Sequence, residues 1–418
     1  MDKVLTFAAF FLISATLFGL MQWRLVRFTI SWVTGTAQPS HRRRWRRAGM
    51  AVLILGNLVL LLRLPAGQLG LYAHPLVQAL IVYPGGFFFA SMVFGFLLLS
   101  VRDLVSLVMG ASRRVLRKHT PRDHSPHGPP REEGRRGVVD LNRRRFLRSA
   151  GIVAAGSVVT LPVVSSAATA RDYQVNRVPL RFENLPAGLE GLTLAQVSDI
   201  HSGIYMTERN MREIFEIVQS LDADIIVLTG DQVDSVEAEI EPMWRAIAML
   251  RAEYGVFGVL GNHDHYANGP KVSAAMEQRH ITMLNNAHRT LTIDGAPLSI
   301  VGIDDAGAGA RNYARLAEAT AGIDRESLTI LLSHRPTVFP AAKKAGMALT
   351  LAGHTHGGQV GLELPGINLN PVYLVYDYAR GLYTEQDKHL YVNVGVGMVG
   401  VPIRLVRPEI ALFTLTAA

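Results

Sequence analysis

The chain has no cysteine among its 418 residues, so disulfides, thiolate metal sites and cysteine nucleophiles are excluded. It also lacks the serine-hydrolase elbow G-x-S-x-G, the zinc motif H-E-x-x-H and a P-loop. One G-x-G-x-x-G pattern runs from Gly395 to Gly400, but it leads into a strand-like segment rather than a helix. We interpret these glycines as turn residues, so no nucleotide cofactor is expected.

Charge is scarce over long stretches of the front half. Between Arg47 and Arg102 the only Lys, Arg, Asp or Glu is Arg63. Apolar stretches at residues 4–23, 50–64 and 76–101 approach or exceed the ~20 residues that cross a bilayer. Packed helices of a soluble core are the alternative, but three such stretches within one hundred residues favour a membrane region over residues 1–110.

The loop at residues 66–75 has no positively charged Lys or Arg. The loops at 24–47 and 102–148 are rich in Arg, and such loops stay in the cytoplasm. Residues 1–150 hold 22 Lys and Arg against 6 Asp and Glu, whereas residues 151–418 hold 20 against 28. The acidic back half argues against a nucleic-acid partner.

Residues 111–141 are rich in Pro, His, Arg and Gly, which predicts a disordered cytoplasmic linker. Residues 142–148 then read NRRRFLR and precede a charge-free stretch ending in Ala168-Thr169-Ala170. This order resembles a twin-arginine export signal, with the twin-arginine translocase as a partner. A fourth spanning helix over 149–170 is the alternative. Either one sends residues 172–418 to the extracytoplasmic side of the cell membrane.

The back half alternates short β-branched segments with helical ones. Buried strands are predicted at residues 192–198, 225–229, 256–260, 298–303, 328–333 and 348–352. Helices are predicted at 211–220 and 242–253. This alternation indicates an α/β fold, in which functional residues lie on loops at strand ends.

Metal-ligand side chains follow five of these strands. They occur as Asp199-Ile200-His201, Asp231 with Asp234, Asn262-His263-Asp264, His334, and His354-Thr355-His356. Residues i and i+2 of an extended segment point the same way, so Asp199 with His201, and His354 with His356, are each expected to reach one spot. Imidazole with carboxylate suits Mn, Fe, Zn or Ni and disfavours calcium.

The series Asp-x-His, Gly-Asp-x-x-Asp, Gly-Asn-His-Asp, His and Gly-His-x-His resembles the calcineurin-like metallophosphoesterase superfamily over residues 190–360. The stretch 352–359 with Pro402-Ile403-Arg404 is similar to its twin-arginine-exported bacterial branch. The arrangement of apolar segments before the enzyme resembles transmembrane proteins with a metallophosphoesterase domain. The resemblance implies a β-sandwich flanked by helices, in the order α/β/β/α.

The resemblance also implies roles for individual residues. One metal would be held by Asp199, His201, Asp231 and His356. A second would be held by Asp231, Asn262, His334 and His354, with Asp231 bridging. His263 would protonate the leaving group or stabilise the transition state, and Asp264 would orient its imidazole. Asp234 would support a ligand in the same way or cap a helix.

The expected function is therefore hydrolysis of a phosphate monoester or diester by a metal-bound hydroxide. A membrane receptor that keeps the fold without turnover is one alternative, and an enzyme acting on nucleic acid is another. No ligand is lost, which disfavours the receptor. Phospholipids, lipid-linked sugars and wall polymers are candidate substrates, since the anchor places the site near a membrane.

Overall fold

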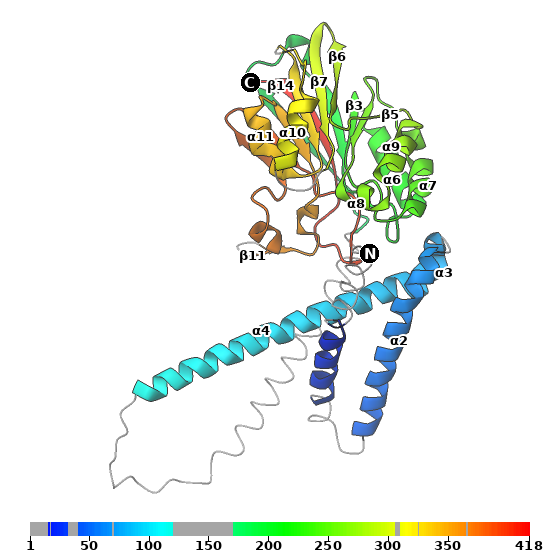
Figure 1. Ribbon diagram of the computed structural model, residues 1–418, viewed down its shortest axis with the longest axis vertical. Helices are drawn as coiled ribbons and strands as arrows, with labels where there is room; N and C mark the ends of the chain where they lie inside the picture. The colour runs from blue at the N-terminus through cyan, green and yellow to red at the C-terminus, as the bar shows by residue number, and fades with distance from the viewer. Residues whose placement is uncertain are drawn as a thin grey trace, which may run out of the picture. The chain divides into compact units, whose positions relative to one another are not determined.

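The computed structural model describes residues 16, 18–31, 41–68, 71–119, 170–305, 310–324, 326–364 and 367–418. The chain divides into two compact units, one of residues 1–61 and 84–163, the other of residues 62–83 and 164–418 (Figure 1). The second contains the two sheets and, because the sequence predicts an enzyme over residues 172–418, is called the enzyme unit below. Residues 62–83 pack with it, although the sequence groups them with the apolar region.

Long helices dominate the front of the chain: α2 (Arg42–Gln68) and α4 (Tyr83–His119). Within the described residues, one helical stretch, Pro75–Ser112, is long and apolar enough to cross a membrane. It contains the segment predicted at 76–101. The segment predicted at 50–64 lies inside α2, which continues through Pro65.

Other front-half predictions fall mainly on residues that the structure does not describe. Most of the first apolar segment (4–23), most of the linker (111–141), the twin-arginine-like motif (142–148) and nearly all of the stretch 149–170 lie outside the described residues. They remain predictions from the sequence.

The first sheet of the enzyme unit has six strands. Their order is β1 (Gln174–Phe182), β14 (Glu409–Ala417), β2 (Thr193–Val197), β3 (Ile225–Thr229), β4 (Val256–Val259), β5 (Ile281–Met283). All neighbours are parallel except β14 and β2. Helices α6 (Glu208–Ser220), α7 (Ile240–Ala246) and α9 (Gly269–Glu277) cover its outer face (Figure 1).

The second sheet also has six strands. Their order is β12 (Gly381–Glu385), β13 (Lys388–Val392), β9 (Leu349–Ala352), β8 (Leu328–Ser333), β7 (Ala296–Ile303), β6 (Ala287–Ile293). Helices α10 (Ala310–Ala319) and α11 (Phe339–Lys344) pack on its outer face. A further short hairpin joins β10 (Leu362–Leu364) to β11 (Ile367–Leu369).

The inner faces of the two sheets share one hydrophobic core. Leu194, Ile225, Leu298, Leu332 and Phe413 are among its fully buried side chains. The central strands are covered on both faces, so they are continuous apolar runs rather than alternating ones. The predicted α/β/β/α sandwich is confirmed, and the six predicted strands correspond to β2, β3, β4, β7, β8 and β9. The helix predicted at 242–253 is shorter, because α7 ends at Ala246 and a single 3₁₀ turn follows.

Candidate metal centre

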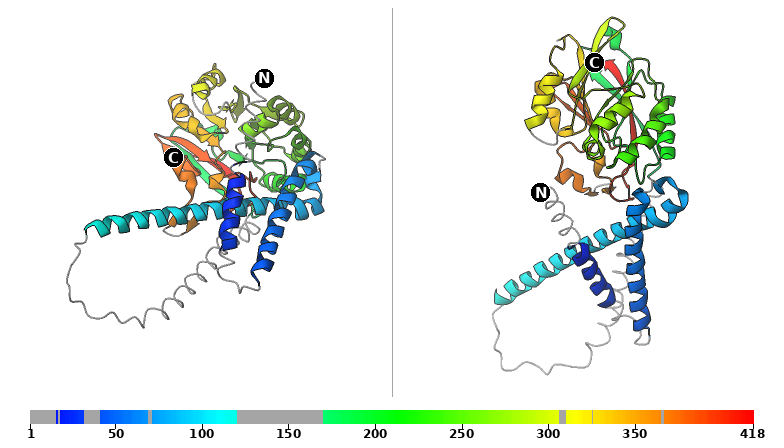
Figure 2. Two further views of the ribbon diagram at one scale, coloured as in Figure 1. Left: turned by 60° about the horizontal axis from the view of Figure 1, so that its bottom comes forward. Right: turned by 45° about the vertical axis from the view of Figure 1, so that its right-hand side comes forward.

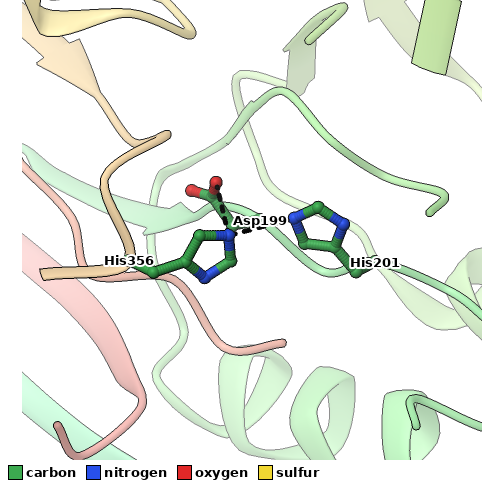
Figure 3. A group of neighbouring side chains, drawn as sticks. All are labelled: Asp199, His201 and His356. Carbon is green, nitrogen blue, oxygen red and sulfur yellow. Dashed lines mark hydrogen bonds and ion pairs between the residues drawn. The ribbon is translucent and has the colours of Figure 1, made fainter. Parts of the chain in front are cut away.

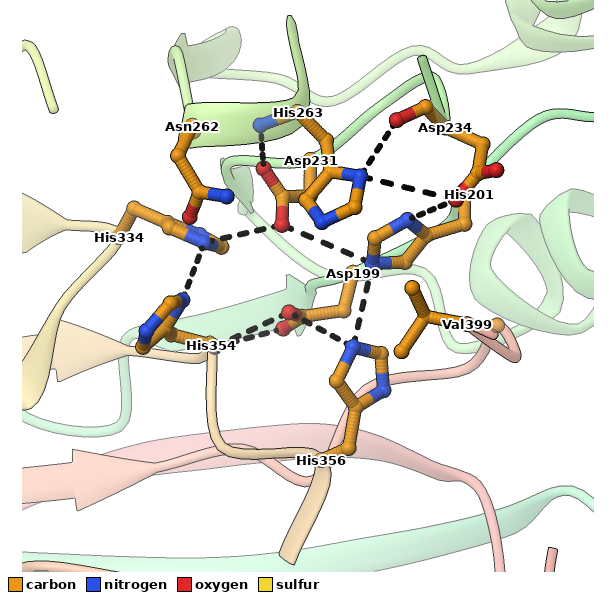
Figure 4. A network of polar contacts seen from close by, with 12 residues as sticks. Asp199, His201, Asp231, Asp234, Asn262, His263, His334, His354, His356 and Val399 are labelled. Carbon is orange, nitrogen blue, oxygen red and sulfur yellow. Dashed lines mark hydrogen bonds and ion pairs between the residues drawn. The ribbon is translucent and has the colours of Figure 1, made fainter. Parts of the chain in front are cut away.

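Loops from both sheets converge where the central strands end (Figure 4). Asp199 and His201 follow β2, and Asp231 follows β3. Asn262 and His263 begin the short helix α8 (Asn262–Ala267) after β4. The second sheet contributes His334 after β8, and His354 and His356 after β9. All seven residues predicted as metal ligands are thus brought to one region.

The backbone delivers these side chains differently from the sequence expectation. Five of these residues have a positive φ: Asp199 (52°), His201 (51°), Asp231 (54°), His354 (73°) and His356 (51°). These values are left-handed, a conformation that costs L-residues energy and that clusters at functional sites. The extended geometry assumed for the Asp-x-His and His-x-His pairs is therefore wrong. His354 and His356 accordingly point to different parts of the site.

Two glycines let the loops approach closely. A β-carbon at Gly353 would lie 2.0 Å from Ser198 Oγ, and one at Gly261 would lie 2.1 Å from Asp231 Oδ1. Neither space admits any side chain, since β-carbons do not approach other atoms below 3.0 Å. Glycine directly before the ligands His354 and Asn262 thus has a steric cause.

Asp199, His201 and His356 form what we call the buried half of the site (Figure 3). Nε2 of His201 lies 3.1 Å from Nε2 of His356, which lies 3.5 Å from Asp199 Oδ1. Burial, with the His201 charge second, lowers the pKa of His356 well below its usual range. Burial also acts to lower the pKa of His201, but the hydrogen bond with Asp234 and the nearby carboxylates raise it overall.

His334, His354 and Asn262 form the open half. Nε2 of His334 lies 3.1 Å from Nδ1 of His354, while His334 Nδ1 donates to the Thr229 carbonyl at 2.9 Å. Burial acts to lower the pKa of His334, but the charge and hydrogen bond of Asp231, together with the Asp199 charge, raise it to about 10. Burial, followed by the His334 charge, lowers the pKa of His354 to about 3. Each half therefore pairs one basic imidazole with one weakly basic imidazole.

Asp231 lies between the two halves. Its Oδ2 is 3.0 Å from His334 Nε2 and 3.6 Å from His201 Nε2. Burial acts to raise the pKa of this carboxyl, but the His334 and His201 charges hold it far below its usual range. Asp231 therefore contacts one imidazole from each half of the site.

The donor set fits two transition-metal ions. Two metal–nitrogen bonds of about 2.0–2.1 Å meeting at one ion place the nitrogens roughly 3 Å apart. The 3.1 Å separations within His201/His356 and within His334/His354 match this spacing. Carboxylates from Asp199 and Asp231 add anionic oxygens, and imidazole with carboxylate favours Mn, Fe or Zn over calcium.

The structure corrects the expectation for Asp264. Its buried carboxylate accepts from the backbone N–H of Val233 at 3.0 Å and of Gly261 at 2.9 Å, so it fixes two loops. His263 instead directs Nδ1 at the backbone carbonyl of Asp234. Burial, with the Asp231 charge second, raises the pKa of Asp264 to about 7. Asp264 thus holds the loop on which His263 lies and does not orient its imidazole.

Asp234 supports the buried half. Its Oδ1 lies 3.1 Å from Nδ1 of His201, which leaves Nε2 of that ring facing the centre. The backbone N–H of His263 donates to Asp231 Oδ1 at 2.9 Å, so His263 is placed beside the ligand cluster. Asp234 was expected either to support a metal ligand or to cap a helix, and the structure shows it in contact with the candidate ligand His201.

Two arginines at the site were not assigned roles from the sequence. Arg335 pairs with Asp305 at 2.9 Å and directs Nη1 at His354 Nε2 and Nη2 at Asn262 Oδ1, at 2.8 and 3.0 Å. The signal was its place next to His334 at a strand end. The buried Arg404 donates to carbonyls of Val394, Gly395, Gly397 and Val406, the loop that backs Asp199.

A family model described as calcineurin-like phosphoesterase matches residues 192–358. The uncharacterized metallophosphoesterase YkuE of Bacillus subtilis is 31% identical over 287 residues, covering 66% of this chain and 98% of that protein. A transmembrane protein with a metallophosphoesterase domain from Bos taurus is 30% identical over 301 residues, covering 68% and 65%. Among solved structures, a dimetal phosphatase from Danio rerio matches with 10% identity and a TM-score of 0.32 over 50% of this chain and 88% of that one.

Proposed function

Because this chain belongs to the calcineurin-like metallophosphoesterase family, we propose that it is a membrane-associated enzyme that uses two metal ions to hydrolyse a phosphate monoester or diester. The observation that carries the proposal is the convergence of imidazoles on two carboxylates: Asp199 groups with His201 and His356, and Asp231 with His334 and His354. Asp231 also lies 3.6 Å from His201 and groups with it and His263, so it connects the two sets.

Asp199, His201, Asp231 and His356 would hold one ion, and Asp231, Asn262, His334 and His354 the other. Two ions bound there would supply Lewis acidity toward the phosphoryl oxygens and lower the pKa of a bound water. Because Asp231 faces both sets of ligands, it would hold both ions, which would together supply positive charge for the attacking and leaving oxygens. The metals proposed are Mn, Fe, Zn or similar ions.

In the reaction, an oxygen–phosphorus bond to water forms, the phosphorus–oxygen bond to the alcohol breaks, and the alcohol oxygen takes a proton. His263 is the proposed donor. The Asp234 carbonyl engages its Nδ1, so Nε2 is the nitrogen that can transfer a proton. A positioned general acid contributes roughly 10²–10⁴-fold to such a step.

Arg335 would bind a phosphoryl oxygen that does not react. Its side chain is 20% exposed, and the buried carboxylate of Asp305 accepts from its Nε. The two terminal nitrogens face His354 and Asn262 of the open half. A planar guanidinium can engage two phosphoryl oxygens in parallel, which a lysine cannot.

Membrane association is supported by the apolar helix at Pro75–Ser112 and by the bovine relative's description. We further propose that the enzyme unit lies outside the cytoplasm, since the Arg-rich loops flank an uncharged one. A reporter that works only outside the cytoplasm should be active after residue 171 and inactive near residue 120. Activity at residue 120 would overturn the topology.

The route of export is tested separately. Changing Arg143 and Arg144 to Lys should block export if the twin-arginine translocase carries the folded enzyme unit. Continued export of the double variant would assign residues 149–170 to a fourth spanning helix.

The activity is tested with the full chain in detergent. After removal of metal by a chelator, hydrolysis of p-nitrophenyl phosphate or of bis(p-nitrophenyl) phosphate should be absent and should return with Mn, Zn or Fe. Full turnover in a preparation shown to be metal-free would overturn the metal-dependent proposal. Stoichiometric metal binding without turnover of any ester would favour the receptor.

A further inference from the structure

We propose that the phosphoester hydrolysed here is carried by a membrane lipid, and that an exposed apolar tip beside the metal centre enters the lipid layer. This inference rests on the proposed phosphoesterase function and names its substrate class. The tip consists of Tyr373, Leu374 and Val375, at the end of the 3₁₀ helix η8 (Pro371–Leu374) and just beyond it.

The tip is unusual for the surface formed by residues 170–418. Leu374 is 89% exposed and Val375 73%, with Tyr373 beside them at 42%. In residues 170–418, the other large apolar side chains described as exposed are Val236, Tyr266 and Leu382, which are separate from one another in sequence. Single exposed apolar residues are ordinary, whereas consecutive ones mark an interaction surface.

The tip is held in place and is not a free loop end. Below it Val372 is buried, and its backbone N–H donates to Asn370 Oδ1 at 3.1 Å. Asn370 in turn donates to the Gly357 carbonyl at 2.8 Å, and Gly357 directly follows His356. The buried Asn370 therefore fixes the exposed tip next to the turn that contains the candidate ligand His356.

The tip is also continuous with the open half of the site. Tyr376, the next residue after Val375, places its ring 5.8 Å from the ring of His354 in an edge-on arrangement. A molecule with its phosphate near His354 can therefore extend past Tyr376 toward the exposed apolar side chains. A lipid phosphoester has this arrangement, since its polar phosphate head is joined to an apolar body.

A segment that leads into the candidate membrane helix docks on the same unit. Gln78 Nε2 donates to the Ile204 carbonyl at 2.8 Å, Arg63 donates to the Tyr205 hydroxyl at 2.9 Å, and Val82 is buried against Tyr205 and Met398. All these residues belong to the enzyme unit.

This docking lies close to the metal centre. Tyr205 lies four residues after His201, and Met398 precedes Val399, which borders the ligands (Figure 4). In Figure 1 the docked segment at α3 (Pro75–Val77) and the hairpin that contains β11 lie at the same end of the two sheets as α8, and Figure 2 shows the unit from two further sides.

This placement selects lipid as the occupant. The docked residues 75–83 are the first part of the apolar stretch Pro75–Ser112, so a chain that enters a bilayer there holds the site-bearing end of the unit close to the lipid surface. The tip at that end then meets lipid. A second copy of the chain or a soluble partner would also cover an apolar tip, and the experiment below separates those cases.

The first measurement does not depend on activity. The chain has no cysteine, so Leu374→Cys provides one attachment point for an environment-sensitive fluorophore in the full chain. In nanodiscs of equal amounts of dioleoylphosphatidylcholine and dioleoylphosphatidylglycerol, its emission should shift to the blue and be quenched by doxyl-labelled lipid. The matched control is Leu382→Cys on the edge strand β12, where we expect neither effect.

The second measurement compares lipid-borne and soluble substrates. The double variant Leu374→Ser with Val375→Ser should lose at least about a hundredfold in turnover of dioleoyl phosphatidic acid or dioleoylphosphatidylglycerol, since each of the two apolar side chains transferred from water contributes about one order of magnitude or more. Turnover of bis(p-nitrophenyl) phosphate should stay within about twofold. Leu382→Ser should change neither activity.

Each outcome decides the proposal. A probe at position 374 that stays in water, or that is shielded but not quenched by lipid, overturns lipid insertion even if the chain proves to be a phosphoesterase. If the probe is buried in lipid but the chain hydrolyses no ester, the membrane contact of the tip is supported and the proposed phosphoesterase activity is refuted. Equal loss on lipid-borne and soluble esters would assign the tip to site geometry instead.

Discussion

In the buried half of the metal centre, Asp199, His201 and His356 are each at most 7% exposed, whereas His354 and Asn262 of the open half are partly exposed. Both halves contain two imidazoles separated by 3.1 Å and both face Asp231. Equivalent donors are thus set in different surroundings. Solvent and a phosphate group can reach the open half, while protein surrounds the buried half.

Each half also has an arginine, and the two are used differently. Arg404 is fully buried behind the buried half and donates to backbone carbonyls, so its nitrogens shape a loop. Burial lowers its pKa to about 10, which leaves it protonated at neutral pH. Arg335 reaches the ligand atoms of the open half from its pair with Asp305. We infer that the buried half is built for lasting metal binding and the open half for substrate.

The strongest test removes what the halves share. Asp231→Asn should abolish binding of both metals and lower turnover by more than about 10⁴-fold, since two Lewis acids each contribute several kcal/mol to the transition state. Metal per chain by mass spectrometry and turnover are the measurements. Asp222→Asn is the matched control, because Asp222 is exposed and has a similar φ of 50°. Retention of one full equivalent of metal would show that the halves are independent.

A second test separates proton transfer from metal binding. His263→Ala should lower turnover by about 10²–10⁴-fold while both metals remain, because its imidazole lies beside the ligands and bonds to the Asp234 carbonyl. The loss should shrink for esters with acidic leaving groups, which need little protonation. An equal loss for all leaving groups would assign His263 to binding the phosphate, and loss of metal would make it a ligand.

The third test concerns the loop behind the buried half. Arg404→Met should lower the stability of the enzyme unit by about 2–4 kcal/mol, since it leaves several buried carbonyls without donors. Thermal unfolding of the full chain in detergent measures this, and Arg407→Met, at an exposed arginine nearby in sequence, is the control. Unchanged thermal stability with lost turnover would mean that Arg404 acts on substrate, which would erase the contrast between the two arginines.

The sequence predicted the central strands and the ligands that follow them because both leave short local signals. An apolar run ending in Asp, Asn or His is visible without knowing the fold. The left-handed backbone at Asp199, His201, His354 and His356 was not predicted, since it depends on how the loops pack against one another. The extended geometry was assumed in its place.

Interactions between segments that are distant in sequence could not be predicted from local sequence patterns either. Asp305 and Arg335 are 30 residues apart, and Asp234 contacts His263 through its backbone, which no side-chain motif encodes. The strands β1, β14, β12 and β13 were not predicted, although β2 and β9, which pair with β14 and β13, were. The pairing of β1 with β14 joins residues more than two hundred positions apart. Docking of residues 62–83 on the enzyme unit was likewise not predicted, because the sequence groups these residues with the apolar membrane region, whereas Arg63 donates to Tyr205.

The smallest expected effect tests the open half itself. Arg335→Ala should lower kcat/KM by about 10–100-fold, the usual contribution of hydrogen bonds to a charged group, with both metals retained. Arg335→Lys keeps the charge but loses the planar fork, so it should restore only part of the loss. Asp305→Asn should also lower kcat/KM, but by less, because it loosens the Arg335 guanidinium without removing it.

The kinetic pattern decides which role Arg335 has. If the guanidinium binds an unreactive phosphoryl oxygen in ground and transition states alike, KM and the inhibition constant for inorganic phosphate should rise together while kcat changes little. A fall in kcat at constant KM would mean that the contact forms only in the transition state. Loss of metal from the open half in Arg335→Ala would mean that the arginine holds His354 and Asn262 in place, and the open half would then be as much a structural assembly as the buried one.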